Sequence, residues 1–215
     1  MKYLVLSKKL NCWCFGVGID HCSQNCELYN NGLLPYCQTS INRLGKFMKP
    51  RLTRSEKLLE SDSFVKVMNI EVKQSRSRLI RIYDYGDLSC TNDLIKWVQI
   101  AELNPKLDFW LSTRQEFILN DYFVNKGLKK PDNLNIRYSE NEIKTPEFLI
   151  KFLDEYGITR SIITDDSKKS DCNASKSGSC GVCVDCWDSS KKLIIYLNHG
   201  LMKYRLKDYL GFFRL

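Results

Sequence analysis

The hydrophobic and polar positions of this chain follow two periods in turn. Short apolar runs, rich in β-branched and aromatic residues, predict strands at residues 10–15, 78–83, 107–111, 133–138, 161–164 and 193–197. Apolar residues at helical spacing predict helices at residues 55–72, 93–103, 114–125 and 146–156. The connections between these segments are short, and this alternation is typical of a parallel sheet or a partial barrel.

The alternation also predicts the fold class and the organisation of the chain. We expect an α/β fold, a partial (βα)6-type parallel barrel with Cys-rich metal-binding loops. Residues 1–215 would form a single domain, with the partial barrel at about 10–199, a Cys-rich insertion at 165–190 and a basic and aromatic C-terminal tail at 200–215. A chain of 215 residues is long enough to bury a core of this kind.

Polar residues follow the predicted strands. In parallel β/α folds, functional residues lie on the loops that follow the carboxyl ends of the strands. The residues in these positions are Asp84, Gly86, Asp87, Ser112, Arg114, Glu140, Asp165, Asp166 and His199. Most of the cysteines also follow strands, so we expect all of these groups on one face of the fold. For Asp84 and Asp87, the alternative is turn formation and helix capping beside Gly86.

The unusual feature of the composition is ten cysteines, of which Cys90 stands alone and is expected in the core. The others form two groups, Cys12, Cys14, Cys22, Cys26 and Cys37, and Cys172, Cys180, Cys183 and Cys186. No apolar run approaches the roughly 18 to 20 residues of a membrane span, and we expect no secretory signal. The expected location is therefore the cytoplasm, or the host cytoplasm for a viral protein. Clustered thiols there bind metal more often than they pair as disulfides.

The C-terminal cysteines predict a metal site. Cys180, Cys183 and Cys186 are separated by two-residue gaps, which let three thiolates of one tight loop turn toward a compact inorganic core. With Cys172 as a remote fourth ligand, this is the pattern of a 4Fe-4S cluster. Tetrahedral zinc is the alternative, although zinc sites more often show two separated Cys-x2-Cys pairs.

The N-terminal cysteines suggest a second metal site, with Cys14, Cys22, Cys26 and Cys37 as candidate ligands. A radical S-adenosylmethionine enzyme would show Cys-x3-Cys-x2-Cys after its first strand. Cys22 and Cys26 match the first gap, but Tyr29 stands at the third position. Cys37 or Cys14 would then supply the third ligand by folding back, and buried thiols without metal are the alternative.

Several segments together resemble a known family. They are IRIYDYGDL, DLIKWVQIAELNPKLDFWLSTRQ, PDNLNIRYSE and CGVCVDCWDSSKKLIIYLNH, preceded by the N-terminal cysteines. The chain from Cys22 to His199 looks like the gene product 88-like proteins of phages and related elements. That family in turn resembles the six-stranded partial barrel of radical S-adenosylmethionine enzymes.

The resemblance to radical enzymes implies roles for the residues after the strands. An acidic turn after the second strand of those enzymes holds the methionine amino group, and Gly86-Asp87 occupies the matching place. Cofactor contacts would then come from Asp84, Gly86, Asp87 and Ser112, and the catalytic residues would be Asp87, Arg114 and Glu140. S-adenosylmethionine is the cofactor that this implies, and radical chemistry the activity.

Charge adds a second candidate function. The chain has 33 Lys and Arg against 25 Asp and Glu, a formal charge of +8. A basic loop at residues 43–54 and a basic, aromatic tail at 203–214 would suit nucleic acid, although packing on the fold is the alternative for the tail. Each tetrathiolate metal site carries about −2, which lowers the working charge. The alternative function is therefore a metal-stapled nucleic-acid-binding or interaction protein without catalysis.

Overall fold

The computed structural model describes residues 2–18, 21–22, 36–140, 145–164, 166–172 and 174–197. Within these residues, one twisted seven-stranded sheet keeps its strands in chain order. The strands are β1 (Val5–Ser7), β2 (Cys12–Phe15), β3 (Leu79–Ile82), β4 (Asp108–Thr113), β5 (Leu134–Ser139), β6 (Thr159–Thr164) and β7 (Leu193–Leu197). All six predicted strands are present, as β2 to β7, and run parallel; β1 adds an unpredicted antiparallel hairpin with β2.

The helices connect successive strands. They are α2 (Tyr36–Glu60), α3 (Phe64–Gln74), α4 (Thr91–Glu102), α5 (Glu116–Asn120), α6 (Glu147–Glu155) and the short α7 (Ala174–Ser177). A π-helical turn, η2 (Asp121–Asn125), continues α5. The helices predicted at 93–103, 114–125 and 146–156 are therefore confirmed. None of the helices in the described part of the chain combines the length and the apolarity needed to cross a membrane.

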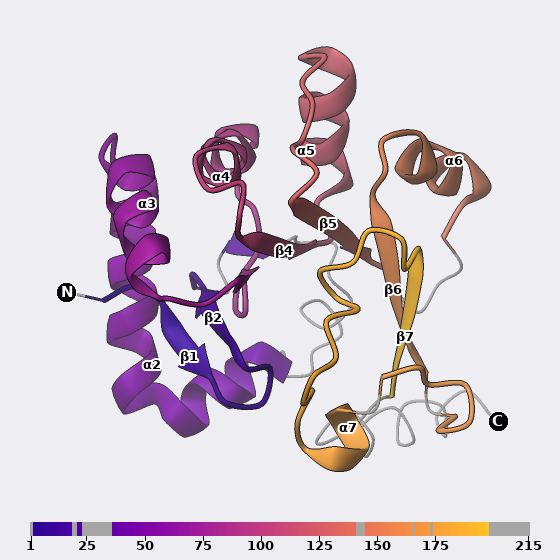
Figure 1. Ribbon diagram of the computed structural model, residues 1–215, viewed down its shortest axis with the longest axis horizontal. Coiled ribbons are helices and arrows are strands. Elements are labelled where there is room, and N and C mark those ends of the chain that lie inside the picture. Colours follow the sequence, from indigo (N-terminus) through magenta and orange to yellow (C-terminus); the bar gives the residue numbers. More distant parts are fainter. Residues whose placement is uncertain are drawn as a thin grey trace, which may run out of the picture.

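The prediction of a basic loop at 43–54 followed by one helix at 55–72 is wrong. Residues 36–60 form α2, and a short break separates it from α3. Pro50 lies inside α2, which changes direction along its length in Figure 1. The helix forms in spite of this proline because Leu52 and Leu59 are buried and Arg51 makes a buried ion pair. Tertiary packing has overridden the local signal for a loop.

The helices cover one face of the sheet, and this side holds the main core. Alternate strand residues such as Phe15, Ile82 and Phe109 point to it and are fully buried. Phe15 and Trp97 of α4 meet edge to face, with 5.0 Å between ring centroids. Figure 1 shows α3, α4, α5 and α6 side by side on this side of the sheet.

The opposite face, which we call the inner face, is covered by the segment between β6 and β7. Its small apolar cluster contains Cys12, Cys14, Trp110 and Trp187. Figure 1 shows the chain around α7 on the side away from the helices α3 to α6. The strand pairings leave β1 and β7 as the two edges, so the described residues form a curved, mostly parallel α/β sheet rather than a closed barrel.

Candidate functional site

Cys12 and Cys14 form a thiol pair on the inner face. They lie two residues apart on β2, so both side chains leave the same face of the sheet. Their sulfur atoms are 3.7 Å apart, and the residues are 0% and 2% exposed. Cys14 was a predicted metal ligand and Cys12 was not, although the C-x-C spacing on a predicted strand is a signal that both side chains leave the same face.

Arg81 of β3 provides positive charge beside this pair. It is the register partner of Cys14, so its side chain leaves the same face. Its guanidinium lies 4.6 Å from the ring centroid of Trp110, within the range of a cation–π contact. A hydrogen bond from Cys12 lowers the pKa of Cys14, and Arg81 lowers it further. The hydrogen bond to Cys14, with burial, raises the pKa of Cys12.

The Cys-rich segment is anchored to the inner face by hydrogen bonds. The Cys180 N–H donates to the Lys9 carbonyl at 2.8 Å, which lies before β2 begins. Trp187 Nε1 donates to the Ile80 carbonyl at 2.9 Å. Trp187 also packs edge to face on Trp110. The expectation that the cysteines share one face of the fold with the polar groups after the strands is therefore wrong for this segment, which folds back over the amino-terminal half of the sheet.

Burial and neighbouring groups raise the pKa values of two thiols in the Cys-rich segment. Burial raises the pKa of Cys180, and the neighbouring Cys172 and Cys183 raise it further. Burial also raises the pKa of Cys186 to about 11, although the Tyr196 hydroxyl, 3.2 Å from its sulfur, lowers it. Cys183 is exposed. The segment therefore places two partly buried thiols and one exposed thiol along a short stretch.

A second arginine, Arg137 of β5, is completely buried beneath the segment. Its guanidinium donates to the carbonyls of Arg160, Asp185 and Lys191 at 2.7, 3.3 and 3.2 Å. Burial lowers its pKa. In the part of the chain that the structure describes, neither Arg137 nor Arg81 forms an ion pair with a carboxylate, and the Nε atoms of both are buried without a hydrogen-bond partner.

The thiols are not gathered into a finished metal site. Among the described residues, no group of three or more His, Cys, Asp or Glu side chains is arranged to hold a metal ion. Of the predicted N-terminal ligands, Cys14 pairs with Cys12, and Cys22 follows β2. Cys26 and the side chain of Cys37 lie outside the described residues. Both metal sites therefore stay predictions.

The acidic turn after β3 is held tightly at the carboxyl edge. Arg51 Nη2 donates to Asp84 Oδ1 at 2.6 Å, and both side chains are nearly buried. The oxygens of Asp87 accept the N–H groups of Leu88 at 2.8 Å and Arg114 at 2.9 Å. Gly86 has a φ of +73°, which favours glycine. Only the Asp87–Leu88 contact is local to the turn; Asp84 and Asp87 are otherwise held by residues distant in the chain, Arg51 and Arg114.

Burial raises the pKa of Asp87 to about 6. Hydrogen bonds from Thr113 and from the backbone of Arg114 and Leu88 oppose this rise, because they favour the carboxylate. A carboxyl group in this state exchanges its proton near neutral pH. Its role in holding a cofactor amino group stays a prediction.

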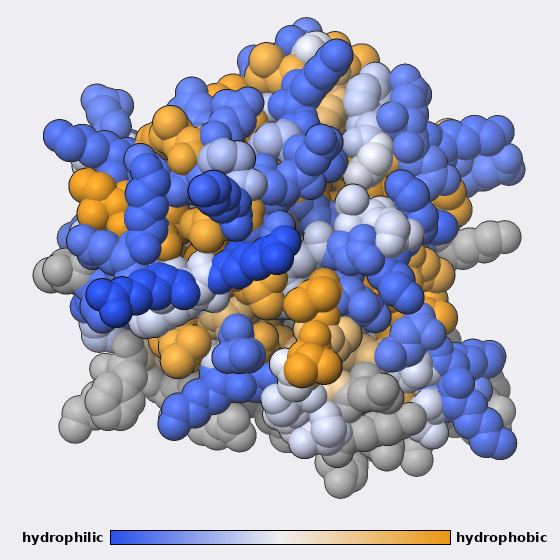
Figure 2. All heavy atoms as spheres, in the orientation of Figure 1, coloured by the Kyte–Doolittle hydropathy of each residue, from blue (hydrophilic) through white to orange (hydrophobic). Residues whose placement is uncertain are grey.

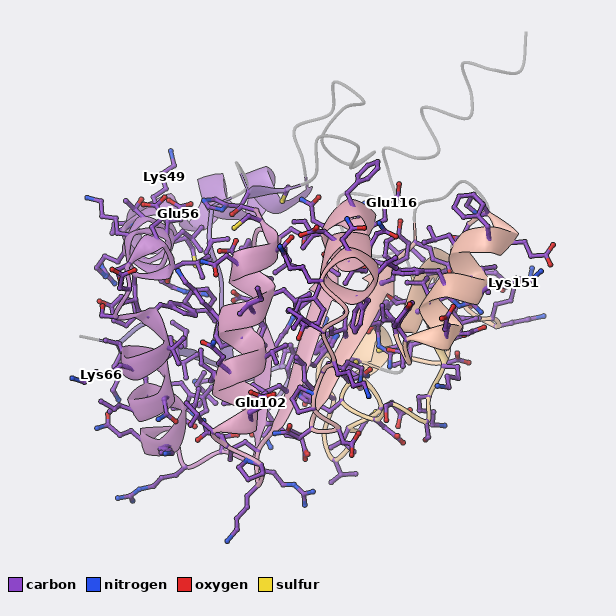
Figure 3. All side chains as sticks on the ribbon, turned by 90° about the horizontal axis from the view of Figure 1, so that it is seen from above. Lys49, Glu56, Lys66, Glu102, Glu116 and Lys151 are labelled. Carbon is purple, nitrogen blue, oxygen red and sulfur yellow. The ribbon has the colours of Figure 1, made fainter. Side chains whose placement is uncertain are left out.

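Of the other residues predicted for the carboxyl edge, Ser112 lies on β4, whereas Arg114 and Glu140 directly follow β4 and β5. The hydroxyls of Ser112, Ser139 and Ser161 form a row, with oxygens 2.9 and 3.3 Å apart. Glu140 pairs with Arg160 at 3.2 Å. Figure 3 shows Glu116, which begins α5 after the carboxyl end of β4, at the same end of the molecule as Glu56. Glu102, which ends α4 before β4 begins, lies toward the opposite end.

The basic residues predicted to bind nucleic acid differ in their exposure to solvent. On α2, Lys49 is exposed and points away from the molecule in Figure 3, whereas Arg51 points inward to Asp84. Figure 2 shows a face on which hydrophilic side chains are interspersed with apolar ones. The tail at 203–214, together with His199 and Asp165, lies outside the described residues. Nucleic-acid binding stays a prediction.

Cys90 differs from its expected place. It was predicted in the core but is exposed, because it directly precedes the first residue of α4. It has extended backbone angles, which are typical of the residue before a helix. It lies at the start of α4, apart from the Cys-rich segment.

Comparison with known protein families shows to which family the chain is similar. A protein family described as gene product 88 matches residues 20–189, most of the chain. No curated protein and no solved structure matches significantly. These findings do not support the likeness to radical S-adenosylmethionine enzymes.

Proposed function

The chain belongs to the gene product 88 family, a phage gene product family, and from this premise we propose that it is a viral iron–sulfur protein. Its Cys-rich segment would hold one 4Fe-4S cluster against the inner face of the sheet. The ligands would be Cys172, Cys180, Cys183 and Cys186. The family match shows membership of the gene product 88 family, and the viral origin and the cluster are proposed.

The observation that carries the proposal is the pair of arginines under the segment. Burying a cation without an anionic partner is costly. Arg137 is completely buried, and in the described part of the chain neither it nor Arg81 has a carboxylate partner. A 4Fe-4S core with four thiolates carries a net charge of about −2, which two guanidinium groups would offset.

The local backbone also suits a loop that wraps around a cluster. Gly181 has a φ of +56°, a conformation that costs glycine little. The Cys183 N–H donates to the Cys180 carbonyl at 2.9 Å, which closes a tight turn between two of the thiols. Free N–H groups and cations near the sulfurs tune the potential of such clusters.

Radical catalysis would need one further feature, a carboxylate at the carboxyl edge that is available to an ammonium group. Asp84 is already paired with Arg51, and both oxygens of Asp87 accept backbone hydrogen bonds. The cluster would also lie over the other half of the sheet. The proposal therefore concerns cluster binding and electron storage, without a radical step.

The test is anaerobic purification, followed by iron and sulfide analysis and electron paramagnetic resonance of the reduced protein. We expect about four iron and four sulfide per chain. Cys183→Ser should lower this content strongly, whereas Cys90→Ser should leave it unchanged. Both thiols are exposed, so neither change should disturb the fold. A colourless protein with stoichiometric zinc alone would refute the iron–sulfur proposal.

A further inference from the structure

Two exposed phenylalanines occupy equivalent positions on neighbouring helices. Phe117 is the second residue of α5 and Phe148 is the second residue of α6, and they are 72% and 74% exposed. Both helices begin after the carboxyl end of a parallel strand, so both first turns lie at the carboxyl edge of the sheet. Figure 1 shows α5 and α6 side by side, and Phe123 of η2 packs on Tyr156 with 5.0 Å between ring centroids. We call Phe117 and Phe148 the phenylalanine pair.

The exposed area of the phenylalanine pair suits a short segment of chain better than a second folded protein. A phenylalanine side chain has roughly 200 Å² of surface, so the pair exposes roughly 300 Å². A stable interface between folded proteins buries about 800 Å² on each partner. A segment of the same chain needs less area, because its covalent link already holds it at a high effective concentration.

The segment at 203–214 has the composition that the phenylalanine pair would accept. Its apolar residues include a set at intervals of three and four, the spacing of one helix face: Leu206, Tyr209, Leu210 and Phe213. The segment also contains four basic residues and one acidic residue. Glu116 and Glu147 are the first residues of α5 and α6. The apolar residues and the positive charge of the segment therefore complement the two first turns.

The chain leaves the described residues close enough to the phenylalanine pair. β7 runs parallel to β6 and ends at Leu197, so its carboxyl end lies at the same edge as the pair. β7 is three strands away from β4, a distance of about 14 Å. The helix layer adds roughly 10 Å. Residues 198–205 alone can span up to roughly 26 Å, so the aromatic residues that follow can reach both first turns.

We propose that the segment at 203–214 docks on the phenylalanine pair of its own chain, with its apolar residues against Phe117 and Phe148. Its basic side chains then lie near Glu116 and Glu147. In the docked state the aromatic side chains of the segment are not available to stack on nucleic-acid bases. The proposal does not depend on the cluster, because none of these residues belongs to the Cys-rich segment.

The test replaces Phe117 or Phe148, one at a time in the full chain, by the photoreactive amino acid p-benzoylphenylalanine. Both side chains are exposed, so neither replacement should disturb the fold, which circular dichroism checks. After irradiation and digestion, mass spectrometry should find cross-links from both positions to peptides of 203–214. Leu103 is the matched control position, because it is 52% exposed but follows α4 at the opposite end of the sheet. A photoreactive residue there should give no cross-link to the segment.

Variants of the segment test the chemistry of docking. Tyr209→Asp combined with Phe213→Asp places two carboxylates on the apolar face, and the cross-links should be lost. Asp208→Asn leaves that face unchanged and should keep them. The cross-linked protein should run at the mass of one chain in denaturing electrophoresis. Cross-links only between two chains, none to 203–214, or cross-links that survive the double Asp substitution would overturn the proposal.

Discussion

The buried carboxyl group of Asp87 should make the stability of this protein depend on pH in an unusual direction. Burial raises its pKa from 3.8 to about 6. The folded state therefore binds this proton more tightly than the unfolded state does. Stability from this group is fully present below about pH 4 and is lost as the pH rises through about 6, the reverse of the usual behaviour of a paired carboxylate.

The size of the pH-dependent change in unfolding free energy follows from the size of the pKa shift of Asp87. A rise of about 2 pKa units corresponds to about 3 kcal/mol of unfolding free energy. Roughly 2 kcal/mol of this falls between pH 4 and pH 7, because the unfolded group is already partly ionised at pH 4. Asp87→Asn removes the titrating group. The stability of the wild type relative to this variant should therefore fall by about 2 kcal/mol between these pH values.

The assay is urea unfolding of both proteins at several pH values, with the difference in unfolding free energy plotted against pH. Comparing the two proteins cancels the other carboxyl groups, among them Asp121 and Asp188, whose pKa values are lowered by hydrogen bonds. Glu147→Gln is the matched control, since its side chain is 81% exposed and solvated in both states. A flat difference for Asp87→Asn, or one that grows with pH, would refute the reasoning.

Two further predictions concern packing. Gly86→Ala should lower the unfolding free energy by roughly 2 to 4 kcal/mol in urea titrations, because φ is +73° and a Cβ would lie 2.5 Å from Val17 Cγ2. Gly127 has a φ of +59°, but a Cβ there would meet open space, so Gly127→Ala should lower the unfolding free energy by only about 1 kcal/mol. Equal losses for the two variants would contradict the close approach of a Cβ at Gly86 to Val17. Trp187→Phe removes the hydrogen bond to the Ile80 carbonyl and should lower the unfolding free energy by about 1 to 3 kcal/mol. It should also speed alkylation of Cys186, measured by mass spectrometry, and unchanged rates would argue against Trp187 as an anchor of the segment.

Local patterns were sufficient to predict most of the secondary structure. Strands such as β4 and β5 contain β-rich apolar runs, and α4 has apolar residues at clear helical spacing. The prediction of a loop was wrong for α2, because a basic stretch with an internal proline locally favours a loop. The helix is stabilised by buried leucines and by the Arg51–Asp84 ion pair, a contact between residues far apart in the chain.

The candidate site was predicted in part. The sequence showed that cysteines are concentrated in two groups, and the structure brings members of both groups, Cys12 and Cys180, near enough for the charge of one to affect the other. The buried contact between Cys12 and Cys14 was not predicted, because a C-x-C sequence gives no local sign that its strand will be paired and covered. Arg81 and Arg137 were missed because an arginine in a strand gives no local sign that it will be buried.

By itself, the sequence determined the alternation of strands and helices, the parallel α/β class and the two concentrations of cysteine. These depend on periods of 2 and about 3.6 residues and on composition, which are properties of neighbouring positions. Only the tertiary structure decided that the Cys-rich segment covers the inner face, and that Asp84 and Asp87 are occupied by internal partners. The physical reason is that a second sheet face must be shielded from water, and long-range contacts such as Trp187 to Ile80 decide which segment shields it.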